Sequence, residues 1–273
     1  MSDVRVRYKR LRILMDDIYS ILRGWYFRLA SGKADKEDYS GWRVISDFST
    51  AIRWREGLGE INQNRIENMK LCCQMISGLI MKPGQVFSLR RLIGEPGLDK
   101  GFRDGPVIVR GKLKMSSGGG LCQVSTTIFN AALAANLKIL QKHNHSTDLW
   151  GENRFIELGR DAVYVFARKD IKFKNNHGSS IIILMDVDEK NLRLNCRILS
   201  QKVLCCTVHV ESRVLDELIP AGARKNGESG QLDYKKGWLV LTKRYVIDTK
   251  GKKKINYLKK EKYKPVLVKE QGD

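Results

Sequence analysis

Cys122 is the residue best placed for covalent chemistry in this sequence. It follows Gly118, Gly119, Gly120 and Leu121 and begins an apolar stretch with helical spacing. Glycines permit positive φ and a close approach of backbone to a ligand, and the first turn of a helix leaves backbone N–H groups unpaired. In comparable settings these groups and the helix dipole lower the pKa of a cysteine to about 3.5–7.5. The pattern predicts a nucleophilic thiolate.

The same backbone is suited to bind an oxyanion when the sulfur attacks a carbonyl carbon. The predicted substrate- and oxyanion-binding set is Gly118, Gly119, Gly120, Leu121, Gln123 and Ser125. One motif would therefore supply both the nucleophile and the electrostatic stabilisation of the transition state.

A thiolate nucleophile usually works with an imidazole, and the chain has four histidines. A helix from Cys122 to about residue 135, followed by a strand over 137–140, would bring the chain back beside the helix start. Because His145 lies at the end of this return, we favour it over His143 as the general base. Asp161 would orient its ring, as the third member of a catalytic triad does.

These residues also have other interpretations. A cysteine at a helix start is commonly a small buried residue, and the His-x-His pair is commonly a surface pair. Cys122, His143 and His145 suit zinc, although no compact Cys-x-x-Cys or His-x3-His pair accompanies them. The glycines match neither common phosphate-loop pattern. We therefore predict no metal and no cofactor, and we interpret the other five cysteines as packing residues.

Composition predicts a folded protein with a positive surface. The chain has 273 residues, 42% hydrophobic and 29% charged, with a net charge of +20. A field of this sign favours anionic partners such as acidic lipid, phosphorylated small molecules or nucleic acid. The chain carries no recognised nucleic-acid motif and its lysines are spread out, so we expect no specific nucleic acid.

The pattern along the chain predicts an α+β fold, with amino-terminal helices packed on a mainly antiparallel sheet and the Cys122 helix at its centre. We expect helices near 11–25, 42–52 and 66–76, and a hairpin turning at Arg110-Gly111. Strand patterns cover 86–89, 163–166, 181–187, 192–198, 238–241 and 245–247. The predicted regions are helical 1–60, core 61–200 and a lysine-rich β extension 201–273.

The first helix is basic and amphipathic. Leu11, Leu14, Ile18 and Trp25 recur at helical spacing behind a cluster of arginines. The stripe would dock on the protein's own core or, in the alternative, lie on an anionic membrane surface. The first 35 residues do not have the pattern of a secretory signal, so we expect a cytoplasmic protein, peripheral at the inner membrane face if the helix touches lipid.

Several of these segments resemble the VanW family. They are the runs KPGQVFS from Lys82 and GPVIVRGKLKMSSGGGLCQVSTTIFNAAL from Gly105, then His145-Ser146, Gly159-Arg160-Asp161-Ala162 and Tyr263-Lys264-Pro265. The resemblance covers about residues 61–200.

The resemblance implies a role in peptidoglycan metabolism linked to glycopeptide (vancomycin) resistance. Multidomain members are similar to cysteine-dependent L,D-transpeptidases, which implies that Cys122 attacks a peptide stem and passes the acyl group to an amine. The implied partner is a peptidoglycan stem or its anionic precursor. The alternative is a non-catalytic cytoplasmic accessory protein that binds such precursors or resistance enzymes.

Overall fold

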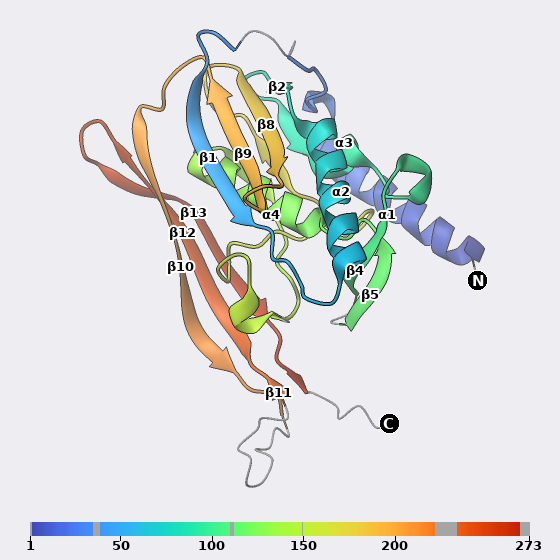
Figure 1. Ribbon diagram of the computed structural model, residues 1–273. Coiled ribbons are helices and arrows are strands. Elements are labelled where there is room, and N and C mark those ends of the chain that lie inside the picture. The colour runs from blue at the N-terminus through green and yellow to red at the C-terminus, as the bar shows by residue number, and fades with distance from the viewer. Residues whose placement is uncertain (1, 35–38, 110–111, 149, 222–233, 268–273) are drawn as a thin grey trace, which may run out of the picture.

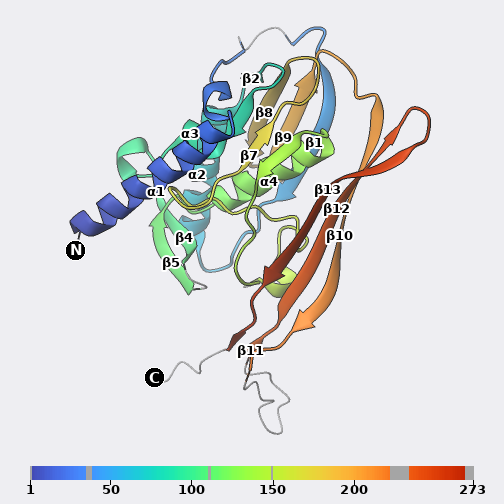
Figure 2. The ribbon, with the colours of Figure 1, turned by 180° about the vertical axis from the view of Figure 1, so that it is seen from behind.

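The central element is a four-stranded antiparallel sheet covered on one face by two helices. The computed structural model describes residues 2–34, 39–109, 112–148, 150–221 and 234–267. The strand order is β1 (Arg43–Ala51), β9 (Arg193–Ser200), β8 (Ile181–Asp188) and β2 (Leu79–Met81). Helix α4 (Leu121–Ala134) lies behind this sheet in Figure 1 and in front of it in Figure 2, next to α2 (Gly59–Ile76). The predicted α+β class is confirmed.

Smaller strands surround this core. A second antiparallel sheet has the order β3 (Val86–Ser88), β7 (Lys172–Lys174) and β6 (Lys138–Gln141), and β4 (Asp104–Val109) pairs with β5 (Lys112–Ser117). The predicted turn at Arg110-Gly111 lies outside the described residues. The short helices are α3 (Leu89–Ile93) and the 3-10 turns Tyr26–Arg28, Leu98–Lys100 and Gly151–Asn153.

The carboxy-terminal residues form a long three-stranded ribbon beside the core (Figure 1). Its order is β10 (Cys206–Leu218), β12 (Gly237–Asp248) and β13 (Lys253–Tyr263), and β11 (Tyr234–Lys235) pairs with β14 (Val266–Leu267). Arg244 fixes the ribbon to the core by donating to the carbonyls of Leu133 and Leu137, at 3.1 and 2.8 Å. The Leu133 carbonyl lies at the negative end of α4, where a cation is stabilised.

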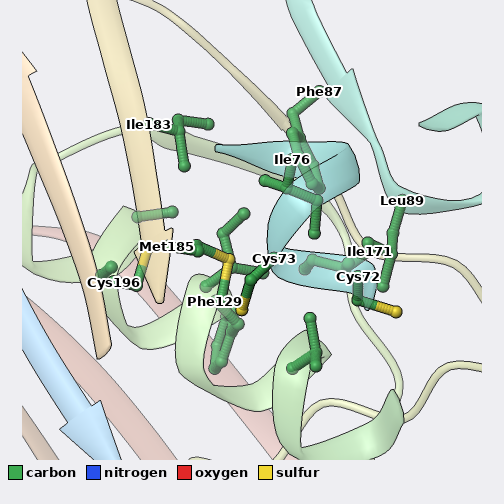
Figure 3. Close-up of a cluster of buried hydrophobic side chains, with 14 of the residues drawn as sticks. Cys72, Cys73, Ile76, Phe87, Leu89, Phe129, Ile171, Ile183, Met185 and Cys196 are labelled. Carbon is green, nitrogen blue, oxygen red and sulfur yellow. The ribbon is translucent and has the colours of Figure 1, made fainter. Parts of the chain in front are cut away.

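The interior between α2, α4 and the sheets is apolar. Figure 3 shows Ile76, Phe129 and Ile183 converging from α2, α4 and β8, and Phe87 stacks on Phe173 with ring centroids 4.5 Å apart. The cysteines behave in two ways. Cys72, Cys73 and Cys196 are buried here as predicted, and burial raises the pKa of all three thiols. Cys205 is exposed and Cys206 half-buried, so the packing interpretation is wrong for Cys205.

The helix predicted over 42–52 is wrong, because these residues form β1. The segment is rich in residue types that favour strands, namely Val44, Ile45, Phe48 and Thr50. Hydrogen-bonded pairing with β9 selects the strand over the helix. The strand expected over 163–166 is reduced to one bridge between Val165 and Lys169. The two strands expected over 238–247 are one continuous strand, β12.

Helix α1 (Ser2–Leu22) lies on the outside of the molecule, on the side of α2 and α3 (Figure 2). Ion pairs join it to the body. Arg90 donates to Asp16 and Asp17, and Lys172 donates to Asp16 at 2.8 Å. In the part of the chain that is described, no helix is both long and apolar enough to cross a membrane.

Candidate functional site

The glycine turn places Cys122 in the first turn of α4. Gly118 and Gly120 have φ of 93° and 100°, and no side chain caps the helix start. A Cβ on Gly120 would lie 3.0 Å from the carbonyl oxygen of Arg65, and one on Gly118 would lie 3.0 Å from Pro96. The glycines therefore serve a tight approach to α2 and to the chain around Pro96, in addition to the positive φ that the turn needs.

Asn68 holds this turn in place from the inner face of α2. Its amide donates to the carbonyls of Gly119 at 3.0 Å and Arg103 at 2.9 Å, and it accepts from the Arg103 N–H at 2.7 Å. Asn68 is fully buried, so these bonds are shielded from water. They fix where α4 begins, and hence where the sulfur lies.

The Cys122 sulfur faces two polar groups. Its Sγ lies 3.7 Å from the carbonyl oxygen of Tyr164, and it is hydrogen-bonded to the His145 side chain. Burial raises the pKa of this thiol, but the hydrogen bond and charge of His145 outweigh burial, so the net shift is downward. The residue is half-buried. The arrangement favours a thiolate paired with an imidazolium.

Asp161 orients the imidazole. The Nδ1 of His145 lies 2.6 Å from Oδ2 of Asp161, and the same oxygen accepts from the backbone N–H of His145 at 2.8 Å. This bond leaves Nε2 for the sulfur. Burial lowers the pKa of His145, but the hydrogen bonds to Asp161 and Cys122 outweigh burial and raise the pKa to about 10.

The second oxygen of Asp161 is held by the far end of the chain. The Tyr263 hydroxyl on β13 donates to Oδ1, and it accepts from the Gly159 N–H at 2.7 Å. Burial raises the pKa of Asp161, but its bond to His145, the charges of His145 and Lys142 and the Tyr263 bond hold it well below its usual value. Asp161 is therefore a buried carboxylate at neutral pH.

Backbone bonds on both sides hold the segment that carries His145. The Val163 N–H donates to the His143 carbonyl at 2.7 Å, and the Lys264 N–H donates to the Ser146 carbonyl at 2.7 Å. His145 therefore lies between the 161–164 segment and the end of β13. This placement suits a group that must hold its ring in a fixed position while it gives and takes a proton.

The structure brings Cys122, His145 and Asp161 together, but it does not bring the side chains of the other predicted residues to the sulfur. Leu121 packs in the core, and Gln123 donates to Thr50 and Ala51 at 3.1 and 2.9 Å. Ser125 is fully buried, and its Oγ has no hydrogen-bond partner among the described residues. Only backbone groups of the predicted oxyanion set lie near the sulfur.

His143 does not join the group. Its Nε2 lies 3.1 Å from the amide nitrogen of Gln141, and burial together with the nearby charge of Lys169 lowers its pKa to about 4. Among the residues with described positions, no three His, Cys, Asp or Glu side chains converge as metal ligands. The zinc set of Cys122, His143 and His145 considered from the sequence is thus not assembled.

Members of the triad line one hollow, and a second, larger hollow has no triad residue in its lining. A crevice of about 30 Å³ is lined by His145, Asp161, Trp150 and Tyr263, among others. A larger cleft of about 360 Å³ lies between α1 and the 167–170 turn, and its cations are Arg12, Arg90, Arg168 and Lys169.

Lys169 lines the larger cleft and donates to the carbonyl of Asn144, the residue before His145, at 3.3 Å. Burial lowers the pKa of Lys169, and the nearby charges of Cys122 and Asp161 oppose that shift. An anionic group bound at this end of the cleft would therefore lie beside the segment that carries His145.

Sequence reasoning missed Asn68 and Tyr263 as parts of the site. Asn68 lies between apolar positions of a helix, and a polar residue on such an inner face is a usable signal because a buried amide must find partners. Tyr263 was visible only as part of the Tyr-Lys-Pro motif. Its contact with Asp161 depends on how the ribbon packs, which no local pattern encodes.

The part of the chain that carries the site is similar to known proteins. Residues 64–197 match the model of a family described as VanW like protein. The uncharacterized protein YoaR of Bacillus subtilis is 34% identical over 122 residues, which are 45% of this chain and 39% of YoaR. The vancomycin B-type resistance protein VanW of Enterococcus faecalis is 32% identical over 131 residues, 48% of each chain. The chain thus spans less than half of each of these relatives. No solved structure matches.

Proposed function

Because residues 64–197 place this chain in the VanW family, which is linked to vancomycin resistance, we propose that it is a cysteine-dependent acyl transferase acting on a peptidoglycan peptide stem. The observation that carries the proposal is the hydrogen-bonded series Cys122, His145, Asp161 at the start of α4. A nucleophile, a base and a group that orients the base are the parts that acyl transfer requires.

The first half of the reaction forms a thioester. The Cys122 thiolate attacks the carbonyl carbon of a stem residue, and the carbonyl electron pair moves to the oxygen. When the C–N bond breaks, the leaving amine takes a proton from the His145 imidazolium, whose neutral form then remains bonded to Asp161. For a stem that ends in D-alanine, the amine expelled is D-alanine.

The second half returns the enzyme to its starting state. An acceptor amine, or water, attacks the thioester carbon while neutral His145 takes its proton. The C–S bond then breaks, and the thiolate re-forms beside the imidazolium. An amine acceptor gives transpeptidation, and water gives hydrolysis.

Backbone groups at the start of α4 are suited to stabilise the oxyanion. The N–H groups of Leu121 and Gln123 are engaged with the carbonyls of Gly118 and Gly120, at 3.3 and 2.9 Å. The Cys122 N–H lies between them, at the positive end of the helix dipole, and we assign it as the oxyanion donor. Such donors contribute about 2.7–4 kcal/mol each to transition-state stabilisation in well-studied enzymes.

The cleft supplies charge for substrate binding. Arg168 and Lys169 line it, whereas Arg90 is already paired with Asp16 and Asp17. Peptide stems carry carboxylates and their precursors carry pyrophosphate, so both suit a cationic cleft. Binding should weaken as salt rises, because exposed charges are screened.

Intact-mass analysis tests the proposal directly. The protein is incubated with a soluble stem precursor that ends in D-alanyl-D-alanine, and with the shorter stem that ends in a single D-alanine. A mass increase equal to the acyl group, mapped to Cys122 and absent in Cys122→Ala, is the expected result. Cys205→Ala is the matched control, because that thiol is exposed and remote from His145 in sequence.

Two outcomes would contradict the proposed enzymatic function. One is the absence of an adduct and of turnover with both stems, when circular dichroism shows a folded protein. The other is an adduct on Cys205 with none on Cys122.

The second candidate is a non-catalytic receptor for the same precursors. It is favoured by the cleft, which is far larger than the crevice at His145 and does not have Cys122 in its lining. Precursor binding that is unchanged in Cys122→Ala, without any covalent adduct in the native protein, would establish this role. A trapped acyl-enzyme would exclude it.

A further inference from the structure

Helix α1 is docked through its polar side. The residues turned toward the body are Ile13, Asp16, Asp17 and Ser20, and the two carboxylates pair with Arg90 and Lys172. Ser20 is buried and accepts from Lys172 at 3.1 Å. Docking of the apolar stripe on the core, as first considered from the sequence, is therefore not what the structure shows.

The apolar stripe points away from the protein. Positions i, i+4, i+7 and i+11 share one face of a helix. Here they are Leu11, Met15, Ile18 and Leu22, which are 53%, 61%, 46% and 80% exposed. Leu14, on the same face, is 56% exposed. A continuous apolar face of this length facing water is costly for a soluble surface and indicates a binding surface.

The charges of the helix differ between its two sides, although Lys9 pairs with Glu95 of the body. Its acidic residues with described side chains, Asp16 and Asp17, are both used against the body. Arg10 is exposed, Arg12 lies over the ring of Tyr8, and Arg23, the residue that follows the helix, lies over the ring of Tyr19. The outer side thus combines apolar side chains with cations. This combination complements an anionic lipid surface. An apolar surface of a protein partner would not require cations beside the apolar side chains.

We propose that α1 binds an anionic membrane surface, lying in the interface with Leu11, Leu14, Ile18 and Leu22 inserted among the acyl chains. The helix would lie parallel to the membrane. Leu11 and Met15 also border the larger cleft, so the cleft would open at the membrane surface. This proposal rests on the exposed face of α1 and not on any activity of Cys122.

Vesicle flotation of the full chain tests the proposal. We expect binding to vesicles that contain about 30% phosphatidylglycerol, and at least tenfold weaker binding to pure phosphatidylcholine. Raising salt to about 0.5 M should weaken binding to the anionic vesicles, because screening acts on exposed cations.

Stripe variants show which residues bind. Leu14→Gln/Ile18→Gln should weaken vesicle binding by roughly tenfold or more, since two side chains no longer leave water. Arg10→Gln should weaken it by about fivefold on anionic vesicles only. Leu98→Gln is the matched control, because Leu98 is 66% exposed but lies outside α1, and its binding should be unchanged.

Three outcomes would overturn the proposal. They are no flotation with either vesicle, flotation that the Leu14→Gln/Ile18→Gln variant leaves unchanged, and a dimer in light scattering that the same variant dissociates. The last would assign the face to a second copy of the chain. Cys122→Ala should float like the native protein, and stripe variants should keep the reactivity of Cys122, so failure here is distinguishable from failure of the proposed enzyme.

Discussion

Tyr263 donates a hydrogen bond to one oxygen of Asp161, while His145 bonds the other oxygen through both its ring and its backbone. The tyrosine lies near the end of β13, 102 residues from the carboxylate. It also accepts from the Gly159 N–H, two residues before Asp161. The carboxy-terminal ribbon is therefore part of the triad's support.

Tyr263→Phe should impair the site while keeping the ring in its place. The ring is buried, so its packing is retained, but Asp161 loses a donor and the Gly159 N–H loses its acceptor. We expect a loss of about 1–3 kcal/mol in the free energy of unfolding. Because Asp161 would no longer be fixed on its Tyr263 side, it would orient the His145 ring less firmly, and the alkylation rate of Cys122 at pH 6 should also fall. Urea unfolding and mass-resolved alkylation measure the two effects.

Tyr245→Phe provides the control for this substitution. Its hydroxyl donates to Glu211 at 2.7 Å on the same ribbon, in an exposed position. Removing that hydroxyl should change neither Cys122 alkylation nor, beyond a few tenths of a kcal/mol, stability. Equal effects of the two substitutions would mean that the Tyr263 bond has no special role.

His145→Gln should abolish the activation of Cys122. Without the imidazolium, burial is left to raise the pKa of the thiol, so little thiolate exists at pH 6. We expect the alkylation rate of Cys122 at pH 6 to fall roughly tenfold or more, with recovery at high pH. His143→Gln should not change the rate, because that ring bonds Gln141 and is neutral at pH 6. A similar loss in both variants would contradict the assignment.

The ion pair of Cys122 and His145 should also shape stability against pH. The pKa of His145 is raised from 6.5 to about 10, so its contribution is complete below pH 6.5 and is lost as pH rises through about 10. The pKa of Cys122 is lowered from 9.0, so its contribution is complete above pH 9 and is lost as pH falls. Between pH 6.5 and 9 the contribution of His145 to stability falls with pH while that of Cys122 rises.

We therefore expect a plateau with a decline on both sides. The quantity to measure is the unfolding free energy of the native protein minus that of Cys122→Ala/His145→Gln, from urea titrations across the pH range. The difference should be largest between pH 6.5 and 9 and should fall toward pH 10. A difference that does not vary with pH would show that the folded protein holds no such ion pair.

The sequence was sufficient for the local parts of the site. Three glycines before an apolar helical stretch predicted where α4 begins. The number of residues after the helix was enough to predict that His145 lies beside the start of α4. Long-range packing decided the rest. Residues 42–52 fit both a helix and a strand, and pairing with β9 selected the strand. The outward face of α1 depends on Asp16 and Asp17 meeting Arg90, a contact across 73 residues or more that periodicity does not encode.

Gly120→Ala should destabilise the turn that carries the nucleophile. A methyl group there would lie 3.0 Å from the Arg65 carbonyl oxygen and 3.2 Å from Met69, at a φ of 100°. We expect a cost of about 2–4 kcal/mol from the backbone conformation and the clash together. Gly251→Ala separates the cost of the backbone conformation from that of the clash. Its φ is 77°, and no atom lies within 4 Å of the position that a Cβ would take. If both variants lost the same unfolding free energy, close packing against α2 would not explain Gly120.

Lys142 and Glu261 form a buried ion pair between the core and the ribbon, behind Asp161. Lys142 also donates to the Gly159 carbonyl at 3.2 Å, and burial raises the pKa of Glu261 while Lys142 opposes that shift. Lys142→Met leaves Glu261 charged and unpaired, so we expect a loss of about 3–5 kcal/mol in unfolding free energy. Lys142→Met/Glu261→Gln removes the uncompensated charge. This double variant should recover much of the lost unfolding free energy, because the cost lies in the isolated carboxylate. If the double variant were no more stable than Lys142→Met alone, the loss would come from the Gly159 bond and the packing of the lysine stem.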